Sequence, residues 1–168
     1  MTSVQLNSLP LADFIRIVGP VFEHSPWIAE ATGPQRPFAS VTALHTALCQ
    51  TVTAATEAQQ LALIRAHPDL VGQLALTGQL TRESTTEQAS AGLTQLTAAE
   101  VEQFQTNNAA YKAKFSFPFI ICARLNKKDA ILQGFATRLQ NSHEQEIKTA
   151  LEEIFKIADL RLKDLITH

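Results

Sequence analysis

The spacing of apolar residues constrains the fold most, because it follows the helical period along most of the chain. Between residues 11 and 18, apolar side chains recur at i, i+3, i+4 and i+7, and a Gly-Pro pair ends the run. Similar stripes lie within 41–52, 101–115, 131–139 and 147–165. This spacing is typical of amphipathic helices. We therefore expect an all-α fold of roughly seven to eight helices.

Helix starts are marked by capping patterns. The segments "TEAQ" at 56–59, "STTE" at 84–87, "TAAE" at 97–100 and "SHEQ" at 142–145 have the capping-box spacing, in which the fourth residue reaches back to the amide of the first. Ser40 and Ser25 are expected to cap two further helices. On this pattern, Glu87 binds the amide of Ser84.

One aromatic segment departs from the helical pattern. "FSFPFI" at 115–120 has the composition of a strand, but Pro118 argues against a central strand. We expect an extended connector, rich in Phe and Pro, that lines the core. The chain has no repeat, no low-complexity tract and no long linker, so a single domain over residues 1–168 is expected.

Composition excludes several classes of protein. A net charge of −2 gives no basic surface for nucleic acid or an anionic membrane. No apolar stretch approaches the roughly 18 residues of a membrane span, and "MTSVQLNSLP" is unlike a secretory signal. Cys49 and Cys122 lie in apolar sequence without metal-ligand spacing, which predicts reduced thiols in a cytoplasmic protein.

The segment "RAHPDL" at 65–70 carries a candidate for acid–base chemistry. Proline disfavours helical geometry at His67, so the preceding helix must end there. The carbonyl groups at a helix C-terminus favour a protonated histidine, which could donate a proton near neutral pH. The alternative is a capping histidine before a proline stop, with Asp69 capping the next turn. Spacing alone leaves both interpretations open.

Three other polar residues also have two interpretations. Glu87 is either a capping residue or part of a site, because "STTEQ" at 84–88 offers hydroxyl, carboxylate and amide groups at a helix N-terminus that can cradle a ligand. Arg161 lies beside an apolar stripe, where it either extends to solvent or points inward and needs an anion such as a substrate carboxylate. Asn108 is either a core amide or a binding group.

Familiar cofactor and nucleophile motifs do not occur in the sequence. The five histidines form no HExxH and no Cys/His pair, so no metal site is expected. No GxGxxG or Walker loop provides a site for a nucleotide cofactor, and no serine has the setting of a nucleophile elbow.

The tripeptide "HPD" also occurs in J-domains, the co-chaperones of Hsp70-type ATPases. In J-domains it follows a basic helix and usually precedes lysine, whereas here it follows "TEAQQLALIRA" and precedes Leu70. The tyrosine-rich upstream helix is also missing. A J-domain-like module and a non-catalytic helical interaction module are the alternative functions.

A longer resemblance covers nearly the whole chain. "LIRAHPDL" at 63–70, "STTEQASAGL" at 84–93, "NNAAYKAKFSFPFIICAR" at 107–124 and the segment 131–165 together resemble the OHCU decarboxylase family. OHCU is 2-oxo-4-hydroxy-4-carboxy-5-ureidoimidazoline. Ser116 departs from the family, which often has glycine there, and a serine is tolerated unless that backbone needs a positive φ.

The resemblance implies a function and a set of site residues. The family is all-helical, needs no cofactor, is commonly dimeric and converts OHCU to (S)-allantoin in urate degradation. The catalytic histidine and acid match His67 and Glu87, and a substrate-binding arginine matches Arg161. The remaining substrate contacts match Pro68, Ser84, Thr85, Thr86, Gln88 and the backbone of Phe119, Ile120, Ile121, Cys122 and Ala123. No metal is implied.

Overall fold

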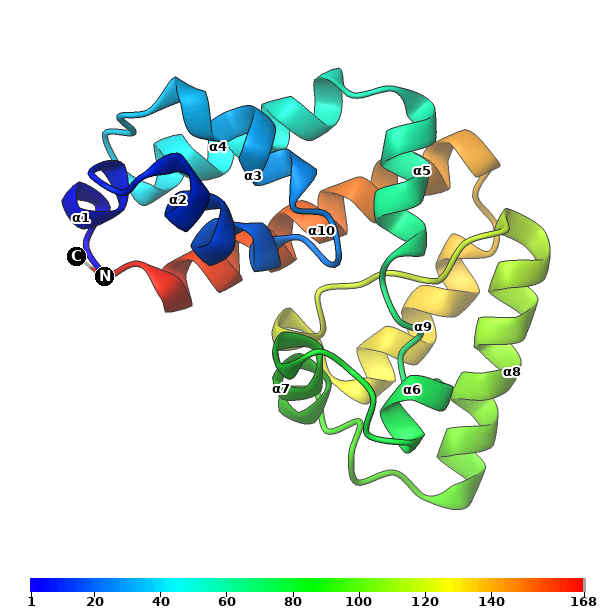
Figure 1. Cartoon of the computed structure of the whole chain (residues 1–168). Helices are drawn as coiled ribbons and strands as arrows, with labels where there is room; N and C mark the ends of the chain where they lie inside the picture. Colours follow the sequence, from blue (N-terminus) through cyan, green and yellow to red (C-terminus); the bar gives the residue numbers. More distant parts are fainter. Residues whose placement is uncertain (168) are drawn as a thin grey trace. The chain divides into compact units, whose positions relative to one another are not determined.

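A computed structural model describes residues 1–167, except for the side chain of Leu74. All regular elements of this part of the chain are helices, which confirms the all-α prediction (Figure 1). The helices of eight or more residues are α2 (Leu11–Val18), α4 (Val41–Ala54), α5 (Glu57–Arg65), α7 (Arg82–Ser90), α8 (Ala98–Phe115), α9 (Lys128–Arg138) and α10 (His143–Leu165). Shorter elements are α1 (Ser3–Asn7), α3 (Trp27–Thr32), α6 (Gln73–Leu76) and the 3₁₀ turns η1 (Gly19–Val21), η2 (Gly33–Gln35) and η3 (Ala123–Leu125).

Contacts divide the helices into two compact units. Unit 1 combines Met1–Ala66 with the segment from Phe155 onward, and unit 2 is His67–Ile154. The division therefore falls between Ala66 and His67, inside "RAHPDL". Because unit 1 is built from both ends of the chain and α10 contributes to each unit, the single-domain organisation stays a prediction.

Unit 1 packs α3 against α2 and α4 (Figure 1). On α4, His45 binds through Nε2 to the carbonyl oxygen of Phe155 on α10 at 2.8 Å. The two ends of the chain also meet, because the Thr167 amide donates to the Met1 carbonyl at 2.8 Å. A buried apolar core that includes Phe14, Ile28 and Leu48 holds these helices together.

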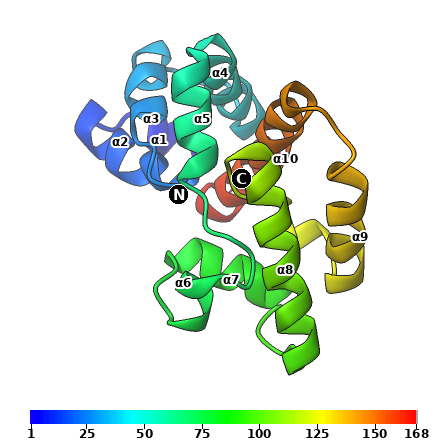
Figure 2. The same cartoon turned by 90° about the vertical axis from the view of Figure 1, so that its right-hand side faces the viewer.

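Unit 2 places α9 beside α8 (Figure 2). It also packs α7 against η3. The connector between α8 and η3 forms no helix or strand, as expected, and supplies Phe117 and Phe119 to the core. Phe119 stacks on Phe135 of α9 with ring centroids 3.9 Å apart, and meets Tyr111 of α8 edge-on at 5.2 Å. Aromatic packing thus fixes the connector from both sides.

The capping predictions succeed at most helix starts. Ser40, Thr56 and Thr97 are the N-caps of α4, α5 and α8, and the last two form complete capping boxes. Ser142 and Gln145 exchange the corresponding bonds ahead of α10. The prediction for Ser25 is wrong: the N-cap of α3 is Pro26, and the Ser25 hydroxyl instead donates to the Glu23 carbonyl at 2.9 Å.

Candidate functional site

His67 lies immediately beyond the end of α5. The helix ends at Arg65 with Ala66 as its C-cap, so Pro68 marks the end of the helix as predicted. His67 is only 9% exposed. His67 opens a loop, residues 67–72, which leads to α6 within unit 2.

Side chains of α7 and α8 bind the backbone of this loop. Gln88 accepts the Val71 amide through Oε1 at 3.0 Å and donates from Nε2 to the Asp69 carbonyl at 3.3 Å. Asn108 donates from Nδ2 to the Leu70 carbonyl at 2.8 Å. Asn108 is therefore a buried amide that holds the loop.

Two loop residues have unusual environments. Asp69 does not cap α6, whose N-cap is Gly72 without a side-chain bond, so the capping prediction for Asp69 is wrong. Its Oδ2 instead accepts from Lys112 of α8 at 2.8 Å.

Val71 has a φ of +53°, in the left-handed region that a β-branched residue rarely adopts. Such strain persists only where the surroundings impose it.

Helix α7 starts three residues earlier than "STTE" predicts. Thr81 is the N-cap and its hydroxyl accepts the Ser84 amide at 3.3 Å. Glu87 therefore lies in the second turn, and its assignment as the distal capping residue is wrong. The expected N-terminal cradle at 84–88 is also wrong at this position, since the Thr85 amide already donates to the Thr81 carbonyl at 2.9 Å.

Helix α7 places the predicted contact residues on two faces. Ser84, Glu87 and Gln88 are buried, at 5%, 9% and 5% exposure. Their spacing of three and four residues places them on one face of the helix. Thr85 and Thr86 are exposed, and their hydroxyls donate back to carbonyls of the preceding turn. A site on the buried face of α7 thus has Ser84, Glu87 and Gln88 available.

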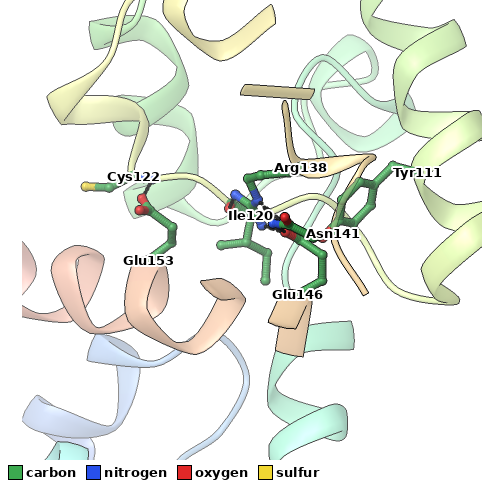
Figure 3. Close-up of polar contacts among 7 residues, drawn as sticks. All are labelled: Tyr111, Ile120, Cys122, Arg138, Asn141, Glu146 and Glu153. Carbon is green, nitrogen blue, oxygen red and sulfur yellow. Dashed lines mark hydrogen bonds and ion pairs between the residues drawn. The ribbon is translucent and has the colours of Figure 1, made fainter. Parts of the chain in front are cut away.

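The connector backbone at 119–123 is the third predicted part of the site in unit 2. Its 3₁₀ continuation, η3, packs against α7, and Lys127 donates to the Ser90 carbonyl at 2.9 Å. Arg138 of α9 donates to the Ile120 carbonyl, while Glu153 of α10 accepts the Cys122 amide at 2.8 Å (Figure 3). Unit 2 therefore links the His67 loop to α7, and α7 to the end of the connector.

Arg161 lies in unit 1, on the part of α10 beyond Phe155. It points inward, with 7% exposure, and Nη1 lies 3.0 Å from the Glu23 carboxylate. The sequence predicts that an inward-pointing arginine needs an anion, but it does not show that Glu23 supplies this anion. The available signal was an acid inside the apolar run "PVFEH".

A cavity of about 360 Å³ is lined in part by Gln88, but neither His67 nor Glu87 contributes to its wall. Its wall is mainly apolar and includes Val71, Leu76, Leu80, Gln88, Leu93 and Leu96.

Among the described residues, no group of three or more His, Cys, Asp or Glu side chains could hold a metal ion. No described helix is both long enough and apolar enough to cross a membrane.

Comparison with known proteins identifies the family. The family model for OHCU decarboxylase matches residues 7–163. The chain belongs to the OHCU decarboxylase family. It is 43% identical over 162 residues to the 2-oxo-4-hydroxy-4-carboxy-5-ureidoimidazoline decarboxylase of Amia calva, covering 96% of this chain and 93% of that protein. The Xenopus laevis family member of the same name is 41% identical over 163 residues, covering 97% and 93%.

Two solved structures share the fold. A crystal structure of (S)-allantoin synthase has a TM-score of 0.81 at 32% identity, and covers 99% of this chain and 54% of that one. A crystal structure of OHCU decarboxylase in the presence of (S)-allantoin has a TM-score of 0.69 at 22% identity, covering 84% and 92%. The second likeness bears on the fold alone.

Proposed function

We propose that the protein decarboxylates OHCU to (S)-allantoin in urate degradation, without a cofactor, and that His67 donates a proton while Glu87 orients it. The observation that carries the proposal is the family match over residues 7–163. The environment of the two residues supports their roles. Both are nine-tenths buried in unit 2, and Gln88, the neighbour of Glu87, binds the loop that His67 opens.

The substrate itself makes a cofactor unnecessary. Decarboxylation leaves an electron pair on the carbon that loses CO₂, and enzymes commonly supply an acceptor for such a pair with a cofactor. In OHCU, the ring imine carbon is bonded to that carbon, so the pair can move into the imine. The protein then has to position the substrate, exclude water and deliver a proton.

His67 is suited to proton delivery because histidine exchanges protons near neutral pH. General acid catalysis of this kind contributes about 10²- to 10⁴-fold in rate. Delivery to one face of the intermediate sets the chirality of the product. The buried connector, with Phe119 and Ile120 at 1% and 4% exposure, keeps water from this part of unit 2.

Substrate contacts are proposed for those residues implied by the resemblance that are buried or half-buried. These are Pro68, Ser84, Gln88 and the backbone of 119–123, all in unit 2. The exposed hydroxyls of Thr85 and Thr86, which are bound to their own helix, are omitted. Arg161 is retained as a substrate-binding residue on the resemblance, with Glu23 as its partner in unit 1.

The test is turnover of freshly generated OHCU, followed by the optical activity of the allantoin formed. His67→Gln and Glu87→Gln should lose 10²-fold or more in kcat and keep their helical circular dichroism. Glu83→Gln, on the same helix and half-buried, is the matched control and should retain wild-type turnover. Racemic allantoin formed by the wild type at the uncatalysed rate would overturn the proposed function.

The role of Arg161 has a separate readout. Arg161→Lys should raise KM for OHCU about tenfold or more, because a lysine lacks the planar fork that pairs with a carboxylate. Arg16→Lys, at an exposed arginine of α2, should leave KM unchanged. A wild-type KM in Arg161→Lys would remove Arg161 from the proposed site.

The proposal also includes a cytoplasmic homodimer that works without metal. Sedimentation velocity should give about twice the mass of the 18.4 kDa chain. Turnover should survive dialysis against EDTA without added cofactor. A monomeric active species would overturn the dimer, and loss of turnover restored by a metal ion would overturn metal independence.

A further inference from the structure

Unit 2 contains a buried polar cluster that the proposed chemistry does not use. Arg138 of α9 and Glu146 of α10 form an ion pair, with Nη2 and Oε2 2.8 Å apart, and are 7% and 0% exposed. Asn141 donates to Oε1 of Glu146 at 2.8 Å, and the Tyr111 hydroxyl donates to Oε2 (Figure 3). The carboxylate is thus bound on both oxygens.

Stability alone is a weak reason for such a cluster. Burying an ion pair costs desolvation energy that its attraction often only offsets, and apolar replacements are frequently as stable. The cluster does, however, also bind the connector through Arg138. Nη1 of Arg138 donates to the main-chain carbonyl of Ile120, in the connector.

A second charged side chain binds the same segment two residues later. Glu153 of α10, half-buried, accepts the Cys122 amide through Oε2 at 2.8 Å. The Cys122 carbonyl accepts from the Leu125 amide at 3.1 Å and the Asn126 side chain at 3.0 Å. The backbone on both sides of Ile121 is therefore held by groups from other elements.

The Ile121 main chain lies between the two bound residues and is itself left open. In extended backbone, residues i and i+2 direct their main-chain polar groups to one side and residue i+1 to the other. Cys122 is extended, with φ −69° and ψ 93°. Among the described residues, none binds the main-chain N–H or carbonyl of Ile121. An adjacent donor and acceptor of this kind match the N–H and C=O of a cyclic amide or ureido group.

We propose that Glu153 and Arg138 are positioning residues, which hold the Cys122 amide and the Ile120 carbonyl so that the Ile121 main chain faces the ureido or ring-amide edge of the substrate. Neither side chain touches the substrate. This inference rests on the proposed function, because it takes the connector backbone as a substrate contact.

Glu153 gives the sharper test, since its removal leaves the Arg138–Glu146 pair intact. Glu153→Ala removes the acceptor for the Cys122 amide, whereas Glu153→Gln keeps an acceptor oxygen. We expect Glu153→Ala to raise KM for OHCU about tenfold, with a smaller change in kcat. Glu153→Gln should stay within about threefold of wild type, and Glu152→Ala, at the exposed neighbouring position, should not change KM.

A measurement independent of activity separates this inference from the proposed function. The chain has two cysteines, so labelling with ¹⁵N-cysteine gives one amide signal each for Cys49 and Cys122. In Glu153→Ala, the Cys122 amide should shift and exchange its proton faster, while the Cys49 amide stays unchanged. If the amide changes and KM does not, positioning is overturned and the proposed function stands. An unchanged Cys122 amide also overturns the positioning role.

Arg138 requires a variant that keeps its charge, because a neutral replacement leaves Glu146 buried without a cation. Arg138→Lys retains the charge and cannot bind both Glu146 and the Ile120 carbonyl with one planar group. KM for OHCU should rise about tenfold in the folded variant. A folded Arg138→Lys protein with wild-type KM would overturn the role of Arg138, and if the variant fails to fold, the Glu153 experiments decide the inference.

Discussion

The Val71 amide donates to Oε1 of Gln88 across 3.0 Å, in a buried bond that joins the loop after His67 to the helix of Glu87. The same side chain donates from Nε2 to the Asp69 carbonyl. The oxygen and the nitrogen of the Gln88 side-chain amide therefore both bind the loop backbone. Since Val71 has a φ of +53°, this pair of bonds holds a strained conformation four residues after the predicted proton donor.

Gln88→Leu should destabilise the protein and reduce its activity. The replacement keeps much of the side-chain volume but leaves the buried Val71 amide without an acceptor, which costs about 1–3 kcal/mol in the free energy of unfolding. We expect kcat for OHCU to fall at least tenfold, because the loop that holds His67 loses its support. Urea unfolding and steady-state kinetics measure the two effects.

Asn108→Leu separates loop support from substrate contact. Asn108 binds the Leu70 carbonyl and is outside the proposed set of substrate contacts. Asn108→Leu should reproduce the fall in kcat. Gln79→Leu, at an exposed position, should change neither kcat nor the free energy of unfolding. Wild-type kcat in both buried variants would show that the loop needs neither amide.

Local signals explain which parts of this fold could be predicted from sequence. The starts of α5 and α8 depend on residues three apart, so a capping box identifies them. For α7 the sequence predicts a start three residues too late, because "STTE" has the same pattern, while the true cap, Thr81, accepts the Ser84 amide. Where two residues could cap the same helix equally well, tertiary packing decides between them. A short motif carries no information about that packing.

The partners of buried charges could not be predicted, because they are distant in the sequence. Arg161 pairs with Glu23 across 138 positions, and the Tyr111 hydroxyl reaches Glu146 across 35. The spacing indicates that Arg161 needs an anion if it points inward. It does not indicate whether the anion comes from a substrate or from the protein. For Ser116, the sequence identifies a positive φ as the condition under which serine is unfavourable. The structure shows a φ of +62° at this residue.

Ser116→Gly should stabilise the protein. Ser116 ends α8 in the left-handed conformation, with φ +62° and ψ 23°, where a side chain is unfavourable and glycine is not. We expect the free energy of unfolding to rise by about 0.5–1 kcal/mol. Ala113→Gly, an exposed interior position of the same helix, should lower it by about 1 kcal/mol. Equal signs for the two variants in urea unfolding would contradict the left-handed assignment.

Cys49 should react slowly with alkylating reagents although it is only half-buried. Burial, and then the Asp159 carboxylate, raise the pKa of its thiol to about 11. Because the thiolate is the reactive form, iodoacetamide at pH 8 should modify Cys49 at least about 100-fold more slowly than cysteines of the urea-unfolded chain. Peptide mass spectrometry distinguishes Cys49 from the buried Cys122. A rate that reaches its plateau below pH 9 would indicate an ordinary thiol.

Tyr111 should remain protonated in the folded protein at pH values where tyrosine normally ionises. Burial, first, and the hydrogen bond to Glu146 raise its pKa, while the Arg138 guanidinium acts in the opposite direction. Tyr111 is the sole tyrosine of the chain, so absorbance near 295 nm reports this one group. The native protein should show no tyrosinate between pH 10 and 11, whereas the urea-unfolded chain should titrate near pH 10.

The same raised pKa links stability to pH with a defined sign. Above pH 10 the unfolded chain loses the tyrosine proton and the folded protein keeps it, so the unfolded state gains stability relative to the folded one. The contribution of Tyr111 is thus complete below pH 10 and declines as pH rises towards the folded pKa. Tyr111→Phe cannot ionise and should lose less stability between pH 9.5 and 11 than the wild type, measured by urea unfolding. An equal or steeper loss in Tyr111→Phe would show that folding does not raise the pKa of the hydroxyl.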